Sequence, residues 1–204
     1  MALRMKCTGI VLVGRAVSET KPPKGLFMMK LRPLVAWTVE ALSKVCDEVL
    51  VACPPESAAA VRAVLPKRVR VVEDEFLGVG YLGGLHAALK LASYPWVALA
   101  PSEAPLTSPA LYRLLLGELK GHDGAVPFQN DNPEPLHGVF KRKALLAAVE
   151  TEMLHGIGGL REALPDMNIR KVGPRKLEAA DPQKRSFWRL ESPEAIRAVE
   201  GMLK

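Results

Sequence analysis

Short apolar runs alternate with helical segments along this chain, and the alternation constrains its fold more than any other feature. Residues 7–14 and 96–100 are continuous apolar runs, the pattern of strands buried on both faces of a parallel sheet. Residues 33–45 instead carry apolar side chains at helical spacing. This order predicts an α/β fold of three layers, with helices on both faces of a doubly wound, mostly parallel sheet. We expect strands at 7–14, 47–53, 68–73, 96–100, 124–128, 136–140 and 169–172, and helices at 33–45, 56–65, 85–92, 108–119, 143–154, 160–164 and 193–203.

The composition is that of one globular domain spanning residues 1–204. Hydrophobic residues make up 49% of the chain and charged residues 25%, and no shift in composition marks a linker. The net charge of +6 suits an anionic partner, but the basic residues are scattered and only 5% of residues are aromatic. Nucleic-acid binding is therefore not favoured. Cys7, Cys46 and Cys53 include no C-x-x-C pair, so we expect core residues and neither disulfides nor a zinc site.

The chain carries no signal for a membrane or for export. Its apolar runs are far shorter than the roughly 18 residues of a membrane span. Residues 1–7 contain two basic residues but no cleavage-type sequence follows them. We therefore expect a cytoplasmic protein.

The loop after the first strand, residues 14–24, has the charge for a phosphate but not the sequence of a known phosphate loop. It lacks both G-x-x-x-x-G-K-[ST] and G-x-G-x-x-G, and it holds a single glycine. Its basic residues, Arg15, Lys21 and Lys24, outnumber its one acidic residue, Glu19, so the loop has a positive net charge. Two interpretations stay open: a clamp of point charges on a phosphate, or a solvated loop stiffened by proline.

Three further loops hold residues that suit chemistry. Residues 78–84 contain four glycines directly before a helix, a pattern that favours close approach of a ligand to the backbone. Glu103 follows the fourth strand and is a candidate magnesium ligand, although a surface carboxylate is an equal interpretation. His137, close to Glu134, is interpreted as a hydrogen-bonded structural histidine more readily than as a general base.

A set of short segments spread over nearly the whole chain carries a family resemblance. The most specific are Gly-Gly-Leu-His-Ala-Ala-Leu at 83–89, Glu-Pro-Leu-His at 134–137, and Arg-Ser-Phe at 185–187 with Ser-Pro-Glu at 192–194. Residues 10–14, 24–26, 32–34 and 72–74 add to them. In this order and spacing they resemble the molybdenum cofactor guanylyltransferases, the MobA-like branch of the nucleotidyltransferases, from Thr8 to Lys204.

The resemblance implies a Rossmann-like fold of the nucleotide-diphospho-sugar transferase type. It also implies GTP- and Mg²⁺-dependent transfer of GMP to molybdopterin, with release of pyrophosphate. Lys24 and Glu103 are then the expected catalytic residues, and Glu103 is the expected metal ligand. The expected nucleotide-binding residues are Leu12, Val13, Gly14, Lys24, Asp74 and Gly83.

The same resemblance sets the expected partners. These are GTP or another nucleotide such as CTP, molybdopterin, and molybdoenzymes or cofactor-biosynthesis proteins, whereas nucleic acid and membrane are not expected. A sugar-1-phosphate guanylyltransferase also stays open, because that wider superfamily shares the fold.

Several positions depart from the family pattern. In the loop, Arg15, Val17, Glu19, Lys21 and Pro23 stand where the family has glycine, serine, arginine, glycine and aspartate. Glu103 stands for an aspartate, and Arg189 and Glu191 stand for asparagines.

Two hypotheses follow from these departures: a working nucleotidyltransferase, or a relative that binds a nucleotide, a pterin or a partner protein without turnover. Glu19 repels a triphosphate if it faces the cleft. Glu19→Arg should therefore strengthen GTP binding if this loop holds phosphate, and an unchanged affinity would exclude that role for the loop.

Overall fold

The computed structural model describes residues 5–18, 21–76, 78–156 and 159–203. Within these ranges the chain forms an eight-stranded sheet in the order β10-β9-β11-β8-β1-β6-β7, with β12 paired to β9. The strands β1 (Cys7–Leu12), β6 (Glu48–Cys53), β7 (Arg70–Glu73) and β8 (Trp96–Pro101) are parallel. Beyond β8, β11 (Val139–Lys141) runs antiparallel to both β8 and β9. The remaining strands of the sheet are β9 (Gly124–Gln129), β10 (Asn132–Pro133) and β12 (Ile169–Val172).

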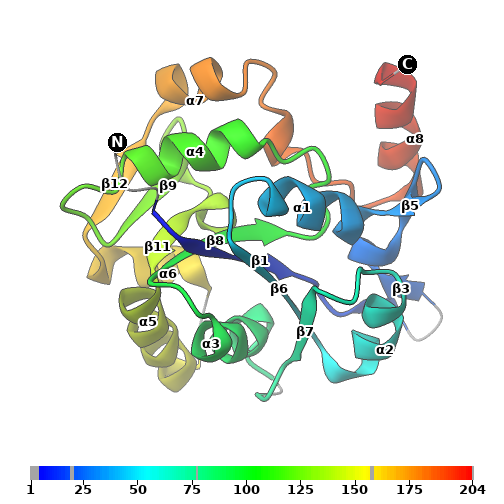
Figure 1. The fold of residues 1–204 in the computed structure, drawn as a ribbon, viewed down its shortest axis with the longest axis horizontal. Coiled ribbons are helices and arrows are strands. Elements are labelled where there is room, and N and C mark those ends of the chain that lie inside the picture. The colour runs from blue at the N-terminus through cyan, green and yellow to red at the C-terminus, as the bar shows by residue number, and fades with distance from the viewer. Residues whose placement is uncertain (1–4, 19–20, 77, 157–158, 204) are drawn as a thin grey trace.

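Helices cover both faces of this sheet, α1 and α4 on one side and α3 and α5 on the other (Figure 1). The strand β1 explains why, since all six of its residues are buried and successive side chains point to opposite faces. Val11 belongs to the core under α1 and α4, whereas Ile10 belongs to the core under α3 and α5. The helices are α1 (Leu34–Ser43), α2 (Pro55–Ala63), α3 (Tyr81–Leu91), α4 (Pro109–Gly117), α5 (Arg142–His155), α6 (Leu160–Ala163), α7 (Pro174–Ala180) and α8 (Pro193–Met202).

The predicted three-layer α/β fold is confirmed, and most predicted elements lie within a few residues of their expected bounds. Ser108 caps α4 as expected, because its Oγ accepts a hydrogen bond of 3.2 Å from the Ala110 amide. The three cysteines are buried in the core, as predicted.

Two predicted boundaries were wrong. The helix α3 begins at Tyr81, so Gly83 and Gly84 lie in its first turn and not in the preceding loop. Positive φ angles occur at Gly78 and Gly80, which form the loop itself. The expected strand at 136–140 begins only at Val139, because residues Pro135–His137 form a 3-10 turn.

The sequence analysis also missed two small hairpins and α7. The strands β2 (Ala16–Ser18) and β3 (Lys21–Pro23) pair with each other, as do β4 (Met28–Met29) and β5 (Arg32–Pro33). Strands of two or three residues are too short for a period-2 pattern, and α7 has a single buried residue, Leu177, so no apolar face marked it.

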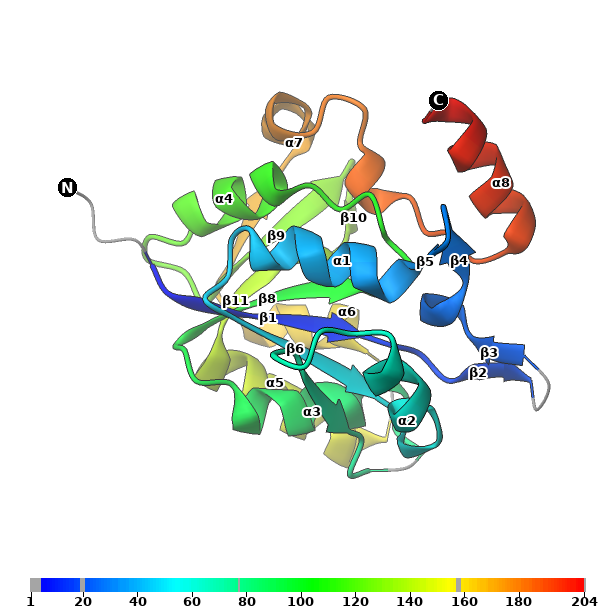
Figure 2. The same cartoon turned by 45° about the vertical axis from the view of Figure 1, so that its right-hand side comes forward.

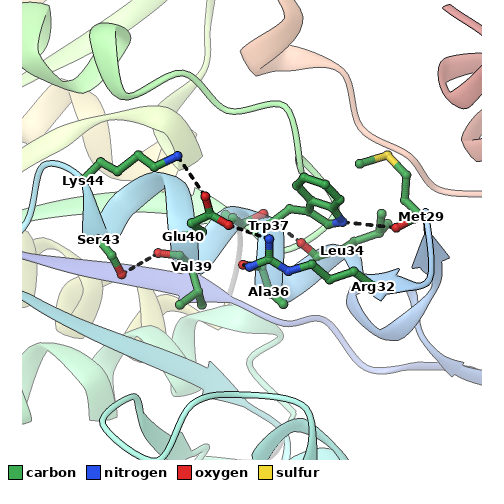
Figure 3. A network of polar contacts seen from close by, with 10 residues as sticks. Met29, Arg32, Leu34, Ala36, Trp37, Val39, Glu40, Ser43 and Lys44 are labelled. Atoms are coloured by element: carbon green, nitrogen blue, oxygen red, sulfur yellow. Dashed lines mark hydrogen bonds and ion pairs between the residues drawn. The ribbon is translucent and has the colours of Figure 1, made fainter. Parts of the chain in front are cut away.

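A polar network joins the second hairpin to α1 (Figure 3). Arg32 donates to the Glu40 carboxylate and to the Ala36 carbonyl, and its guanidinium lies 4.8 Å from the centre of the Trp37 ring. Hydrogen bonds from Lys44 and Arg32 lower the pKa of Glu40 to about 2. The network holds the hairpin in place just after the turn that carries Lys24.

The last helix packs on that hairpin and not on the central sheet (Figure 2). Met29 and Leu34 form a separate apolar cluster with Leu190, Ile196 and Val199. This cluster buries Leu190, whose amide donates to the Glu103 carbonyl, so the chain leading into α8 passes the carboxyl end of β8.

Candidate functional site

A cavity of about 190 Å³ lies at the carboxyl ends of β1, β6 and β7, where α3 begins. In doubly wound sheets this edge is where ligands bind. Four predicted nucleotide-binding residues meet there or at its wall: Leu12, Val13, Gly14 and Asp74. The rest of the lining comes from Arg15, Ala52, Cys53, Pro54, Gly80, Tyr81 and Gly84.

Much of this wall is backbone whose position is fixed by the sheet. The Val13 amide donates to the Ala52 carbonyl at 2.9 Å, and the Leu12 carbonyl accepts from the Ser102 amide at 2.9 Å. Burial raises the pKa of the Cys53 thiol to about 11, so the thiol stays protonated near neutral pH and is not a nucleophile. The cavity therefore suits binding more than covalent chemistry by the protein.

Asp74 and Gly83 form one unit at this cavity. Asp74 is buried, and its Oδ1 accepts a hydrogen bond of 2.9 Å from the Phe76 amide. A Cβ atom on Gly83 would lie 2.1 Å from that same Oδ1. Gly83, which does not line the cavity, thus provides the space that Asp74 occupies, whereas Asp74 itself borders the cavity.

Lys24 and Glu103 lie at the same edge of the sheet. Lys24 opens the 3-10 turn Lys24–Leu26, and a Cβ on Gly25 would lie 2.5 Å from Ser102 Oγ, so this turn packs directly on the end of β8. Ser102 Oγ donates to Glu103 Oε2 at 3.1 Å. The fold therefore brings together the two predicted catalytic residues, which are 79 positions apart in the chain.

The segment before α8 crosses this edge and contacts both of them. The Leu190 amide donates to the Glu103 carbonyl at 2.7 Å. On one side of it Glu191 pairs with Lys24 at 2.8 Å, and on the other Arg189 lies 3.7 Å from Glu134. Sequence reasoning missed these contacts, because the Lys24–Glu191 pair joins positions 167 apart and no local pattern predicts it.

Comparison with known proteins agrees with this geometry. Residues 9–171 match the model of the MobA-like NTP transferase domain. The chain belongs to this family.

The relatives of this MobA-like chain include named guanylyltransferases. It is 26% identical to the molybdenum cofactor guanylyltransferase of Desulfosudis oleivorans, over 97% of this chain and 96% of that protein. It is 30% identical to the probable molybdenum cofactor guanylyltransferase of Methanothermobacter thermautotrophicus, over 92% and 95%.

Solved structures confirm the nucleotide-diphospho-sugar transferase type of fold. Molybdopterin-guanine dinucleotide biosynthesis protein A from Archaeoglobus fulgidus superposes with a TM-score of 0.79 at 25% identity, covering 96% of this chain and 98% of that one. The 4-diphosphocytidyl-2C-methyl-D-erythritol synthase of Anaerococcus prevotii superposes with a TM-score of 0.73 at 13% identity, covering 98% of both chains, and shows the fold alone.

Part of the loop that departs most from the family pattern is outside the described residues. Glu19 and Thr20 are not described, so the prediction for Glu19 stays a prediction. On either side of them the backbone forms the β2–β3 hairpin, and Arg15 lines the cavity.

The residues of this MobA-like site fit a Mg²⁺ ion, although a protein cage for one is absent among the described residues, where no group of three or more candidate metal ligands occurs. Mg²⁺ commonly binds through one or two carboxylates together with substrate phosphates. Glu103, half-buried just after β8, offers one carboxylate at the edge where the turn that carries Lys24 packs.

His137 is buried, and the Ser186 backbone is a weak hydrogen-bond partner of its ring that by itself would raise its pKa. Neither ring nitrogen has a well-formed hydrogen bond to any described residue. Its ring packs edge-on against Phe187, with 5.1 Å between ring centres. Burial, assisted by the charge of Arg189, lowers the pKa of His137 to about 3. The imidazole is therefore neutral near neutral pH and serves as a packing residue of the core.

A larger cavity, about 490 Å³, lies at the opposite end of the sheet, and none of the predicted site residues lines it. Of its two carboxylates, Asp47 accepts a hydrogen bond from the Cys7 amide, and Glu48 accepts hydrogen bonds from Thr8 and from the amide and hydroxyl of Ser93. Burial alone would raise the pKa of Glu48, but these hydrogen bonds outweigh the effect of burial, and the pKa is lowered overall. Glu48 is thus committed to joining three segments of the fold.

Within the described ranges, the helices are all too short or too polar to cross a bilayer.

Proposed function

We propose that this chain is a molybdenum cofactor guanylyltransferase that transfers GMP from GTP to the terminal phosphate of molybdopterin. An oxygen of the acceptor phosphate attacks the α-phosphorus of GTP, the bond from that phosphorus to the β-phosphate oxygen breaks, and pyrophosphate leaves. The observation that supports this best is the convergence of the cavity, Lys24 and Glu103 at one edge of a MobA-like sheet.

Each part of the edge has a role in this proposal. The backbone at Leu12 to Gly14 and the start of α3 receive the nucleoside, with Asp74 at the wall. Lys24 neutralises phosphate charge, which matters because phosphoryl transfer depends mainly on positioning and cations. Glu103 would hold Mg²⁺, which when bound neutralises the triphosphate oxygens.

Calorimetric titration with GTP, CTP and ATP, each with and without Mg²⁺, tests the binding half of the proposal. We expect micromolar, magnesium-dependent binding selective for GTP. Lys24→Met should weaken it, whereas Lys176→Met, which removes a half-exposed lysine on α7 that pairs with Glu118 and does not line the cavity, should not. Preference for CTP would contradict the guanylyltransferase assignment.

Pyrophosphate release in the presence of GTP and molybdopterin tests the transfer half. Release that requires both substrates supports the proposal. Release with a sugar 1-phosphate in place of molybdopterin would assign the chain to that other class of acceptor.

The second hypothesis, binding without turnover, is favoured by one observation. Lys24 faces the carboxylate of Glu191 at 2.8 Å, so the cation needed for the phosphates already has a partner. Tight GTP binding together with no pyrophosphate release under any condition would support this second function.

Two wider expectations accompany the proposal. We propose that residues 1–204 act as one nucleotidyltransferase domain. Cofactor-biosynthesis proteins and molybdoenzymes are the protein partners that the proposed product would require, and the cytoplasm is the expected location.

A further inference from the structure

We propose that Glu191 is a built-in competitor for phosphate at Lys24, so that a polyphosphate binds only by displacing the Glu191 carboxylate. The inference concerns regulation of the same site and rests on the proposed role of Lys24 in phosphate binding. It starts from one contact, the pair of Lys24 Nζ with Glu191 Oε2 at 2.8 Å.

The backbone of Glu191 is fixed, and this makes the pair more than a chance surface contact. Leu190, directly before it, is buried against Met29 and Leu34 and donates its amide to the Glu103 carbonyl. Ser192, directly after it, caps α8 by accepting from the Ala195 amide. The backbone of residue 191 therefore stays at the edge of the sheet where Lys24 and Glu103 lie, whichever way its side chain points.

The side chains of the pair, by contrast, are free to exchange partners. That of Lys24 is 36% exposed and that of Glu191 is 48% exposed. An ion pair with this much solvent changes an equilibrium by less than about fivefold. A polyphosphate, which carries several negative charges and binds lysine as a point charge, competes successfully with such a pair.

The consequence is a site whose affinity for phosphate is held down by its own carboxylate. In the empty site Glu191 neutralises Lys24. When a polyphosphate arrives, it must break the pair, and Glu191 then repels the bound anion from a fixed position nearby. Both effects act in the same direction, so removing the charge of Glu191 strengthens phosphate binding.

Calorimetric titration with inorganic tripolyphosphate tests this, using the full-length protein and its Glu191→Gln variant. The variant should bind about three- to tenfold more tightly than the wild type. The matched control is Glu194→Gln, because Glu194 lies three residues further on and pairs with Arg197 instead of Lys24. This control should bind as the wild type does.

A double variant separates the competitor role from general repulsion. In a Lys24→Met background, Glu191→Gln should give a smaller gain in tripolyphosphate binding, because only the repulsion is removed and there is no pair to break. An equal gain with and without Lys24 would overturn the proposal, as would equal affinity of Glu191→Gln and wild type, or tripolyphosphate binding by neither.

The probe also keeps this test distinct from that of the proposed function. Tripolyphosphate has no base and no pterin, so the result does not depend on guanine selectivity or on transfer. If GTP is not the substrate but Glu191→Gln binds tripolyphosphate more tightly, the competitor role stands alone. If GMP transfer occurs but the variant behaves as wild type, only the competitor role is lost.

Discussion

Replacing Gly83 with alanine should disrupt the site through a single methyl group. The added Cβ would lie 2.1 Å from Asp74 Oδ1 and 2.6 Å from the Phe76 carbonyl oxygen. The carboxylate cannot simply rotate away, because the Phe76 amide donates to Oδ1, and the Phe76 carbonyl belongs to the backbone. Asp74 should therefore lose its hydrogen bond, and the first turn of α3 should also be pushed away from β7.

The magnitude follows from opposing terms. Overpacking of this kind costs about 1–3 kcal/mol, and losing a hydrogen bond to a charged group costs about 1.5–3 kcal/mol. Alanine in place of glycine within a helix returns about 1 kcal/mol. We expect a net loss of about 2–4 kcal/mol in the free energy of unfolding, which lowers Tm by roughly 5–15 °C in a chain of this length.

Gly84→Ala is the matched control, since both glycines lie in the first turn of α3. A Cβ at Gly84 would meet Ala52 Cβ at 3.4 Å, an ordinary contact. This variant should therefore be as stable as the wild type or more stable, by up to about 1 kcal/mol.

Urea unfolding of the two variants and the wild type, with GTP titration of each folded protein, measures both effects. Gly83→Ala should lose stability and also GTP affinity, because Asp74 borders the cavity. A Gly83→Ala protein as stable as Gly84→Ala would refute the reasoning that Gly83 exists to admit the Asp74 carboxylate.

Three further predictions follow. Glu103→Gln keeps the side-chain shape but removes the charge, so the rate of GMP transfer should fall on the order of 100-fold and GTP binding should lose its dependence on Mg²⁺. Glu103→Asp should retain both the transfer activity and the Mg²⁺ dependence. An unchanged Mg²⁺ dependence in Glu103→Gln would exclude Glu103 as a metal ligand. Burial lowers the pKa of His137 to about 3, so as pH falls from about 6.5 to 3 the unfolded chain binds a proton that the folded chain does not. The free energy of unfolding therefore falls over this range by about 1.4 kcal/mol per pH unit. Urea unfolding at several pH values should show that the free energy of unfolding depends less steeply on pH in His137→Gln, and as steeply as in the wild type in the exposed His155→Gln. Ser108→Ala removes the cap of α4 and should cost about 1 kcal/mol in thermal unfolding, a loss that Ser108→Asp should largely avoid.

The order and type of the main elements were predictable because each leaves a local pattern. Fully buried strands such as β1 appear in the sequence as continuous apolar runs, and the start of α4 is marked by the N-cap Ser108 followed by Pro109. The candidate site was predictable in part for the same reason, since strand ends are local features and the carboxyl edge of a doubly wound sheet brings them together. The start of α3 was misplaced because glycines usually mark loops, whereas here two of them lie in the first turn of the helix and one, Gly83, admits the Asp74 carboxylate.

Sequence patterns alone thus predicted the layered α/β fold, the edge of the sheet at which the candidate site lies, and the family to which the chain belongs. Which side chains meet at that edge depends on the three-dimensional packing: Lys24 faces Glu191, Glu103 holds the segment leading into α8, and Gly83 makes room for Asp74. The physical reason is separation along the chain. Hydrophobic period and capping act over a few residues, whereas these contacts join positions up to 167 apart and depend on how the packed sheet and its two hairpins bring them together.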